Sequence, residues 1–158
     1  MQGMTTARGV AMMKIDRVRQ WVIVVVVATL GVGVANELRG DESFSGRLST
    51  VPVDPITAQI TAGSGTLAAV LAGNTLTING TFAGLNSPAT FAHVHRAKKG
   101  LRGPNIFDLT VTKATSGTVA GTLKLTDAQV EALKSGWYYV QIHTEVNPDG
   151  HLRGWLLK

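Results

Sequence analysis

Four histidines are the residues of this 158-residue chain whose type and spacing could support chemistry. His93 and His95 are two positions apart, and His143 and His151 follow later in the chain. Residues two apart on a strand point to one face and lie about 6.6 Å apart along the backbone, so their imidazoles can converge on one ion. We therefore expect a metal site built from His93, His95 and His143, with His151 as its weakest member.

The chemistry of such a site would be imidazole coordination. The sequence contains no Cys, which excludes thiolate metal clusters, disulfides and cysteine nucleophiles. Imidazole suits copper and zinc, so Cu or Zn is the expected cofactor if one is bound. Of these two divalent ions, copper(II) binds a given set of ligands more tightly. The alternative is that His93 and His95 bond to the backbone of adjoining loops and that His143 caps a hairpin.

The elements that must hold these residues are short strands. From about residue 41 the chain is a series of short apolar stretches broken by Gly, Asn and Pro, which favours an all-β sandwich or barrel, and we expect a β-sandwich. The expected strands are Ser43 to Leu48, Thr57 to Ile60, Gly65 to Leu71, Thr75 to Phe82, Thr90 to Arg96, Ile106 to Thr112, Thr118 to Leu125, Trp137 to Thr144 and Leu152 to Leu157.

Strand parity predicts where the histidines point. Ala92, Val94, Val140 and Ile142 alternate with the histidines of the two strands that carry His93, His95 and His143. If these four apolar residues face the core, the three histidines face outward, and Tyr139 and Gln141 share the face of His143.

One helix is expected near the carboxy terminus. Thr126 is followed three residues later by Gln129, then by apolar Val130 and Leu133, and the segment ends at Gly136. This pattern predicts a capping box on a helix of about two turns, closing one end of the sandwich.

The first 35 residues have the pattern of a leader. A basic segment precedes fifteen uncharged residues from Trp21 to Ala35, and a helix of that length rises about 22 Å, short of a hydrocarbon core roughly 30 Å thick. A signal peptide fits better than a membrane span. We expect residues 1–35 to be a signal peptide or amino-terminal membrane anchor, 36–42 a short tether and 43–158 the domain.

Both alternatives place the domain outside the cytoplasm, in the periplasm, at the cell surface or outside the cell. Cleavage is expected after Ala35, with sites near Gly31 and Gly33 as alternatives, and Met13 is a second candidate start. Amino-terminal sequencing of protein recovered from cells checks this, because a chain that keeps residues 24–27 has not been cleaved.

The net charge of +5 does not indicate nucleic-acid binding. Residues 1–20 hold four of the 15 Lys and Arg residues and one of the ten Asp and Glu residues, so they carry +3 of it. The rest lacks a basic stripe with interleaved aromatic residues. A weaker possibility is polyanion binding by a basic loop, with a solvated loop as the alternative; its residues are Arg96, Lys98, Lys99 and Arg102.

Several linked motifs carry a family resemblance. They are Phe91-Ala-His-Val-His95, Gly100-Leu-Arg-Gly-Pro104, Gly136-Trp-Tyr-Tyr-Val-Gln-Ile-His-Thr144 and Asn147-Pro-Asp-Gly-His-Leu-Arg-Gly154. From about Ser43 to Leu157 the chain resembles the CHRD domain, named for chordin and found in many exported microbial proteins. The resemblance implies an extracellular or periplasmic β-sandwich of the immunoglobulin-like, Greek-key type, without a defined activity. The chain departs from the family pattern at Arg96-Ala-Lys-Lys99 and at His151.

The expected function is therefore a noncatalytic binding or structural module of the cell envelope, acting on a protein, polymer or surface ligand and touching a membrane only through an uncleaved leader. The alternative is a His-ligated copper carrier or superoxide-type redox enzyme, since the His-Val-His segment also resembles the copper ligands of copper-zinc superoxide dismutase.

No catalytic residue is identified. Arg153 could bind a ligand carboxylate or contact backbone or an acid. Aromatic residues could stack on sugars or pack in the core; they are Trp137, Tyr138, Tyr139 and Trp155.

Overall fold

The structure is a computed structural model that describes residues 40–51, 55, 58 and 61–158. The expected leader at residues 1–35 lies outside the described residues, and so does most of the expected strand at 57–60. The described residues contain no helix that is long and apolar enough to cross a membrane.

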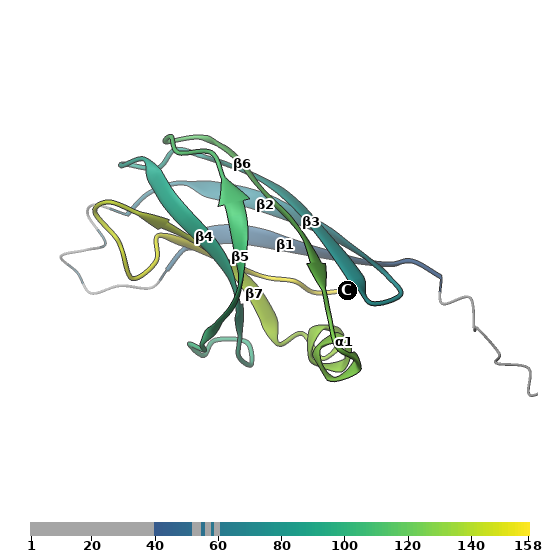
Figure 1. Cartoon of the computed structure of the whole chain (residues 1–158). Helices are drawn as coiled ribbons and strands as arrows, with labels where there is room; N and C mark the ends of the chain where they lie inside the picture. The colour runs from purple at the N-terminus through teal and green to yellow at the C-terminus, as the bar shows by residue number, and fades with distance from the viewer. Residues whose placement is uncertain (1–39, 52–54, 56–57, 59–60) are drawn as a thin grey trace, which may run out of the picture. The chain divides into compact units, whose positions relative to one another are not determined.

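The described part of the chain holds eight strands and one helix, which occupy the other predicted segments (Figure 1). In chain order they are β1 (Glu42–Thr50), β2 (Ser64–Ala72), β3 (Thr75–Ala83), β4 (Ala89–Arg96), β5 (Asn105–Val111), β6 (Gly117–Lys124), α1 (Asp127–Lys134), β7 (Tyr138–Thr144) and β8 (Leu152–Trp155).

The strands close into one antiparallel barrel in the order β1-β2-β3-β6-β5-β4-β7-β8. The all-β class and the short helix are confirmed, but a closed barrel replaces the expected immunoglobulin-like Greek-key sandwich. Two strands change neighbours along their length. β1 pairs with β2 and then, through Ser49 and Thr50, with β8, while β5 pairs with β4 and then, through Thr110 and Val111, with β6. Closure of this kind gives each of the eight described strands a neighbour on both sides.

Strand parity holds where the histidines lie. Ala92 and Val94 on β4, and Val140 and Ile142 on β7, are at most 1% exposed and belong to the hydrophobic core. Because side chains alternate across a strand, the intervening residues of β4 and β7 face the outside of the barrel.

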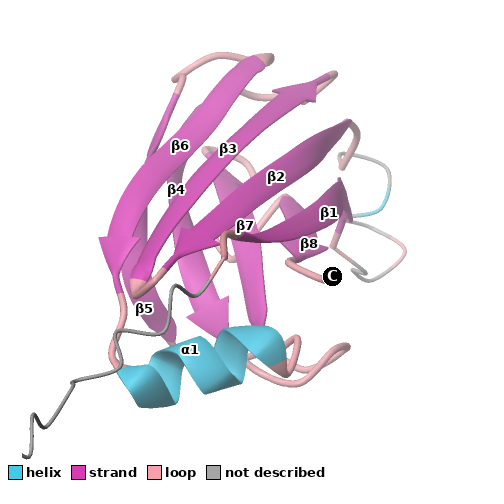
Figure 2. Ribbon diagram, turned by 90° about the vertical axis from the view of Figure 1, so that its right-hand side faces the viewer, coloured by secondary structure: helices cyan, strands magenta, loops and turns pink. Residues whose placement is uncertain are grey.

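Helix α1 lies across one end of the barrel (Figure 2). Thr126 accepts a hydrogen bond from the Gln129 amide and the Gln129 side chain accepts one from the Thr126 amide, which is the predicted capping box. Val130 and Leu133 are buried in the core. Glu42 at the start of β1 ion-pairs with Lys134 of the helix and with the terminal Lys158, and these hydrogen bonds hold the pKa of Glu42 at about 2.

Two glycines allow β1 and β8 to approach closely at the seam of the barrel. A Cβ on Gly46 would lie 2.5 Å from the carbonyl oxygen of Trp155, and a Cβ on Gly154 would lie 2.6 Å from that of Arg47. Backbone atoms cannot move aside as a flexible side chain can. The Gly of the Leu-Arg-Gly motif is therefore required for closure of the barrel.

We expect Gly154→Ala to lower the free energy of unfolding by about 1–3 kcal/mol, the usual cost of overpacking a tight contact. Urea denaturation measures the change. Gly40→Ala is the matched control, because a Cβ there would meet no atom of the described residues within 4 Å. Equal stability of the two variants would contradict this role for Gly154.

Candidate metal centre

The candidate site lies on the outer face of three adjacent strands. The register sets His95 of β4 opposite Tyr139 of β7, and His93 opposite Gln141. Gln141 is in turn opposite Arg153 of β8. His143 pairs with Phe91 at one end of the same face. Residues from distant parts of the chain are thus gathered on one surface, as strand parity predicted.

Backbone and aromatic contacts hold the ring of His95. Its Nδ1 lies 3.0 Å from the carbonyl oxygen of Gly103, and the ring stacks on Tyr139 with centroids 4.9 Å apart and an interplanar angle of 5°. Gly103 reaches this place because it has no side chain: a Cβ there would collide with the carbonyl group of Arg96. The glycine of the β4–β5 loop therefore sets the orientation of the histidine.

His143 is held in the same way by a second loop. Its Nδ1 lies 2.7 Å from the carbonyl oxygen of Pro148, and its ring centroid lies 4.6 Å from that of Phe91. The next carbonyl, that of Asp149, accepts a hydrogen bond of 2.6 Å from Gln141. Gly150, with a φ of +127°, lets the turn lie against Gln141, where a Cβ would collide with the amide group. The turn thus orients two side chains of the outer face.

These bonds determine which nitrogen of each ring is available. A carbonyl oxygen can only accept, so Nδ1 carries the proton in His95 and in His143, and Nε2 carries a lone pair. Both Nε2 atoms are buried and have no hydrogen-bond partner in the described part of the chain. Burial lowers the pKa of both histidines against the opposing effect of their carbonyl partners, with neighbouring His93 a smaller lowering influence. Both rings are therefore neutral at pH 7, as metal binding requires.

His93 completes the group and is less buried than His143. Its Nε2 lies 3.5 Å from Oδ1 of Asp108, whose side chain is 86% exposed. Its ring centroid lies 5.8 Å from that of His95 and 5.0 Å from that of His143. One ring nitrogen from each of the three histidines lies within 4.8 Å of the others, so the group could hold a metal ion. Two bonds of 2.0–2.1 Å span at most about 4.2 Å, so a small shift of His93 would complete the coordination.

His151 belongs to a separate hydrogen-bond network. It is fully buried, and its Nε2 donates to the carbonyl oxygen of Ala62 at 2.7 Å. Its Nδ1 lies 3.0 Å from Oγ1 of Thr144 and 3.1 Å from Nδ2 of Asn147. Both ring nitrogens are thus engaged in structural bonds, and His151 is not part of the group formed by the other three histidines.

The remaining predicted residues lie around this face. All four cations of the basic loop are exposed, with Arg96 and Lys98 each 5.7 Å from the ring centroid of Trp137. The four aromatic residues form no common sugar platform, because Tyr138 is buried in the core and Tyr139 is stacked under His95. No acidic side chain among the described residues forms an ion pair with Arg153.

Sequence reasoning missed the loop carbonyls that orient the site. The Asn147–Gly150 segment stood out only as part of a family motif, yet the carbonyl oxygens of Pro148 and Asp149 accept hydrogen bonds from His143 and Gln141. The available signal was the presence of Gly103 and Gly150 in short polar loops next to strands that carry histidines. Every residue has a backbone carbonyl, so the residue types do not otherwise indicate which carbonyls accept these hydrogen bonds.

Comparison with known families gives one match: the profile of the CHRD domain matches residues 44–156. That range contains all eight strands apart from the first two residues of β1, together with α1 and the three grouped histidines. The searches of curated proteins and of solved structures found no match.

The metal-free protein should lose stability as the pH falls from 7 to 5. Burial lowers the pKa of His151 below 6.5, so the unfolded chain binds the proton first and stability declines as pH falls through 6.5 toward the folded-state pKa. His95 and His143 add to the decline in the same direction. Urea denaturation at several pH values, with a chelator present, measures it.

The variant His151→Gln should show a shallower decline, because its amide can donate and accept but does not titrate in this interval. A wild-type protein equally stable at pH 7 and pH 5 would contradict the assignment of buried neutral histidines. If stability falls as steeply with pH in the variant as in the wild type, His151 is not one of the histidines that cause the decline.

Proposed function

This chain belongs to the CHRD domain family, and we propose that it is an exported protein that binds one copper or zinc ion through His93, His95 and His143. The observation that carries the proposal is the pair of buried, unpartnered Nε2 atoms on His95 and His143. A buried polar atom without a partner costs about 1–3 kcal/mol, and a metal ion supplies the missing partner.

The arrangement around these atoms is that of a prepared ligand set. Ligating histidines in proteins nearly always donate their second ring nitrogen to a carboxylate or a backbone carbonyl, which fixes the ring and its tautomer. His95 and His143 both have such a bond before any ion is present. The alternative expectation, histidines that serve only to bond loops, accounts for Nδ1 in each ring but leaves both Nε2 atoms unexplained.

Copper is the metal that the ligand set favours. Three imidazoles are suitable for both ions, and copper(II) forms the stronger complexes in the divalent series. Three protein ligands leave a coordination position for water or an exchangeable ligand. The site lies on the outer face of the barrel and His93 is only partly buried, which supports reversible binding and a role as a carrier outside the cytoplasm.

The export part of the proposal depends on the leader rather than on the barrel. The basic segment, the short apolar run and the small residues before Asn36 support it. The noncatalytic envelope module expected from the sequence is compatible with metal binding, because a carrier needs no catalytic group.

Calorimetric titration of the metal-free chain with Cu(II) and Zn(II) tests metal binding. Elemental analysis of the loaded protein then gives the number of ions per chain. We expect one Cu(II) per chain. The double variant His93→Ala and His143→Ala should weaken binding at least about 100-fold, since loss of a partner that merely orients a ligand already costs about 10–100-fold.

The matched control for this titration is His151→Gln, because His151 lies outside the group of three. It should bind Cu(II) as tightly as the wild type, and circular dichroism establishes that each variant is folded. Copper affinity that is unchanged in the double variant, or lost equally in His151→Gln, would exclude the proposed site.

A further inference from the structure

Arg153 is a buried cation that the metal site does not use. It is 8% exposed, and its Nε and Nη2 are buried and have no hydrogen-bond partner within the described ranges. Its guanidinium carbon lies 4.8 Å from the ring centroid of Tyr139 and 5.6 Å from that of Trp155. These rings hold the guanidinium in place but cannot replace an acceptor for its N–H groups.

A buried guanidinium normally has an acidic partner. Among the described residues no carboxylate pairs with Arg153, and burial, with Arg102 as a smaller influence, lowers its pKa. Burying a charge is costly unless it is paired and hydrogen-bonded. The missing partner is therefore expected to come from outside the described part of the chain.

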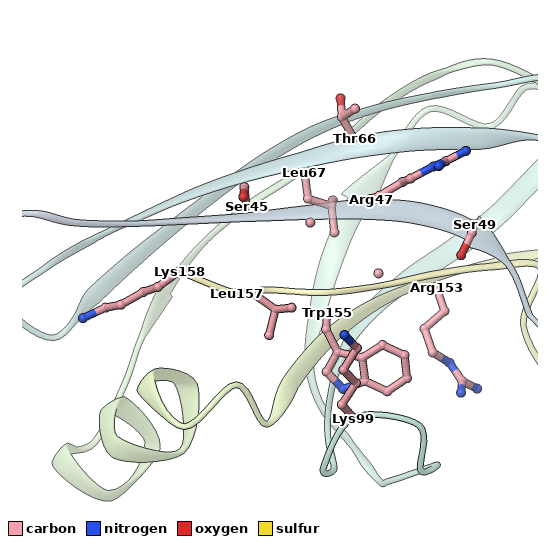
Figure 3. A pocket seen from close by; sticks show the side chains of 12 residues that line it. Ser45, Arg47, Ser49, Thr66, Leu67, Lys99, Arg153, Trp155, Leu157 and Lys158 are labelled. Carbon is pink, nitrogen blue, oxygen red and sulfur yellow. The ribbon is translucent and has the colours of Figure 1, made fainter.

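Arg153 lines a cleft of about 760 Å³ on the barrel surface, between β1 and β8. Figure 3 shows Arg153, Trp155 and Lys99 on one side of the cleft, with Arg47 and Thr66 on the other. Among the described residues, Arg153 is the one that has both buried N–H groups without a partner and a place in the lining of this cleft.

The charge of the cleft is one-sided. Its lining includes four cations and no acidic residue; they are Arg47, Lys99, Arg153 and Lys158. Lys158 forms an ion pair with Glu42, and the other three cations have no acidic partner among the described residues. Hydroxyl groups at Ser45, Ser49 and Thr66 add donors, and the Trp155 ring adds an apolar wall.

We propose that this cleft is a binding site for a small hydroxylated molecule that carries an oxyanion, either a carboxylate or a phosphate, which Arg153 binds through Nε and Nη2. That edge of a guanidinium presents two parallel donors and matches two oxygens of one oxyanion. Lys99 supplies a second positive charge, the hydroxyl-bearing side chains bond to the body of the ligand, and Trp155 packs against its apolar face.

Sugar acids and sugar phosphates have this combination of groups, so they are the appropriate probes. Glucuronate carries a carboxylate, glucose 6-phosphate carries a phosphate, and glucose is the neutral counterpart. Calorimetry or NMR titration of the metal-free full chain with each of the three measures binding without any contribution from the histidine site.

Three variants locate the ligand. Arg153→Gln should weaken binding of the anionic sugar about tenfold, as for loss of a charged hydrogen bond. Lys99→Gln should weaken it about threefold, since an exposed charge contributes less. Lys98→Gln is the matched control, because it removes the same charge from the residue directly before Lys99. Lys98 lies over the Trp137 ring and does not line the cleft.

Binding of glucuronate or glucose 6-phosphate but not glucose, weakened by Lys99→Gln and not by Lys98→Gln, supports the site, and the tighter anion identifies the oxyanion. Equal affinity for glucose, an equal effect of the two lysine variants, or no binding of either anion at millimolar concentration overturns it. Lys99 is exposed, so this comparison stands even if Arg153→Gln fails to fold.

Discussion

Two hydrogen bonds from imidazole Nδ1 atoms to backbone carbonyls determine what the outer face of this barrel can do. The bonds from His95 to Gly103 and from His143 to Pro148 fix both tautomers and leave Nε2 of each ring unprotonated, in two rings that are grouped with His93. In water these rings would rotate freely and titrate near pH 6.5. On the barrel they are neutral and oriented, so most of the ordering that a metal ion would impose is already present in the folded protein.

The rest of the fold serves to bring those carbonyls into place. The core pairs of β4 and β7 fix which side chains point outward, and closure between β1 and β8 through Gly46 and Gly154 fixes the strand that carries Arg153. The face then combines neutral imidazoles at one side with an uncompensated cation at the other. Tyr139 contacts both, since it stacks on His95 and lies under Arg153.

Local patterns predicted most of the elements, because period-two alternation and a capping box depend on neighbouring residues only. Strand spacing fitted a sandwich or a barrel and did not decide between them: nothing local in Gly46 or Gly154 shows that each approaches a carbonyl of another strand. The outward histidine trio followed from parity, whereas the place of His151 depended on contacts with Ala62, Thr144 and Asn147 that spacing cannot reveal. The atoms that orient His95 and His143 are backbone carbonyl oxygens, and these could not be predicted because every residue has one.

The most direct test of this account is the tautomeric state of the histidines in the metal-free protein, read from ¹⁵N chemical shifts of the imidazole rings at pH 7. The account predicts a protonated Nδ1 and an unprotonated Nε2 for His95 and His143, with both Nε2 resonances shifting when one equivalent of Zn(II) is added. The opposite tautomer in these two rings, or Nε2 resonances that the ion leaves in place, would contradict it.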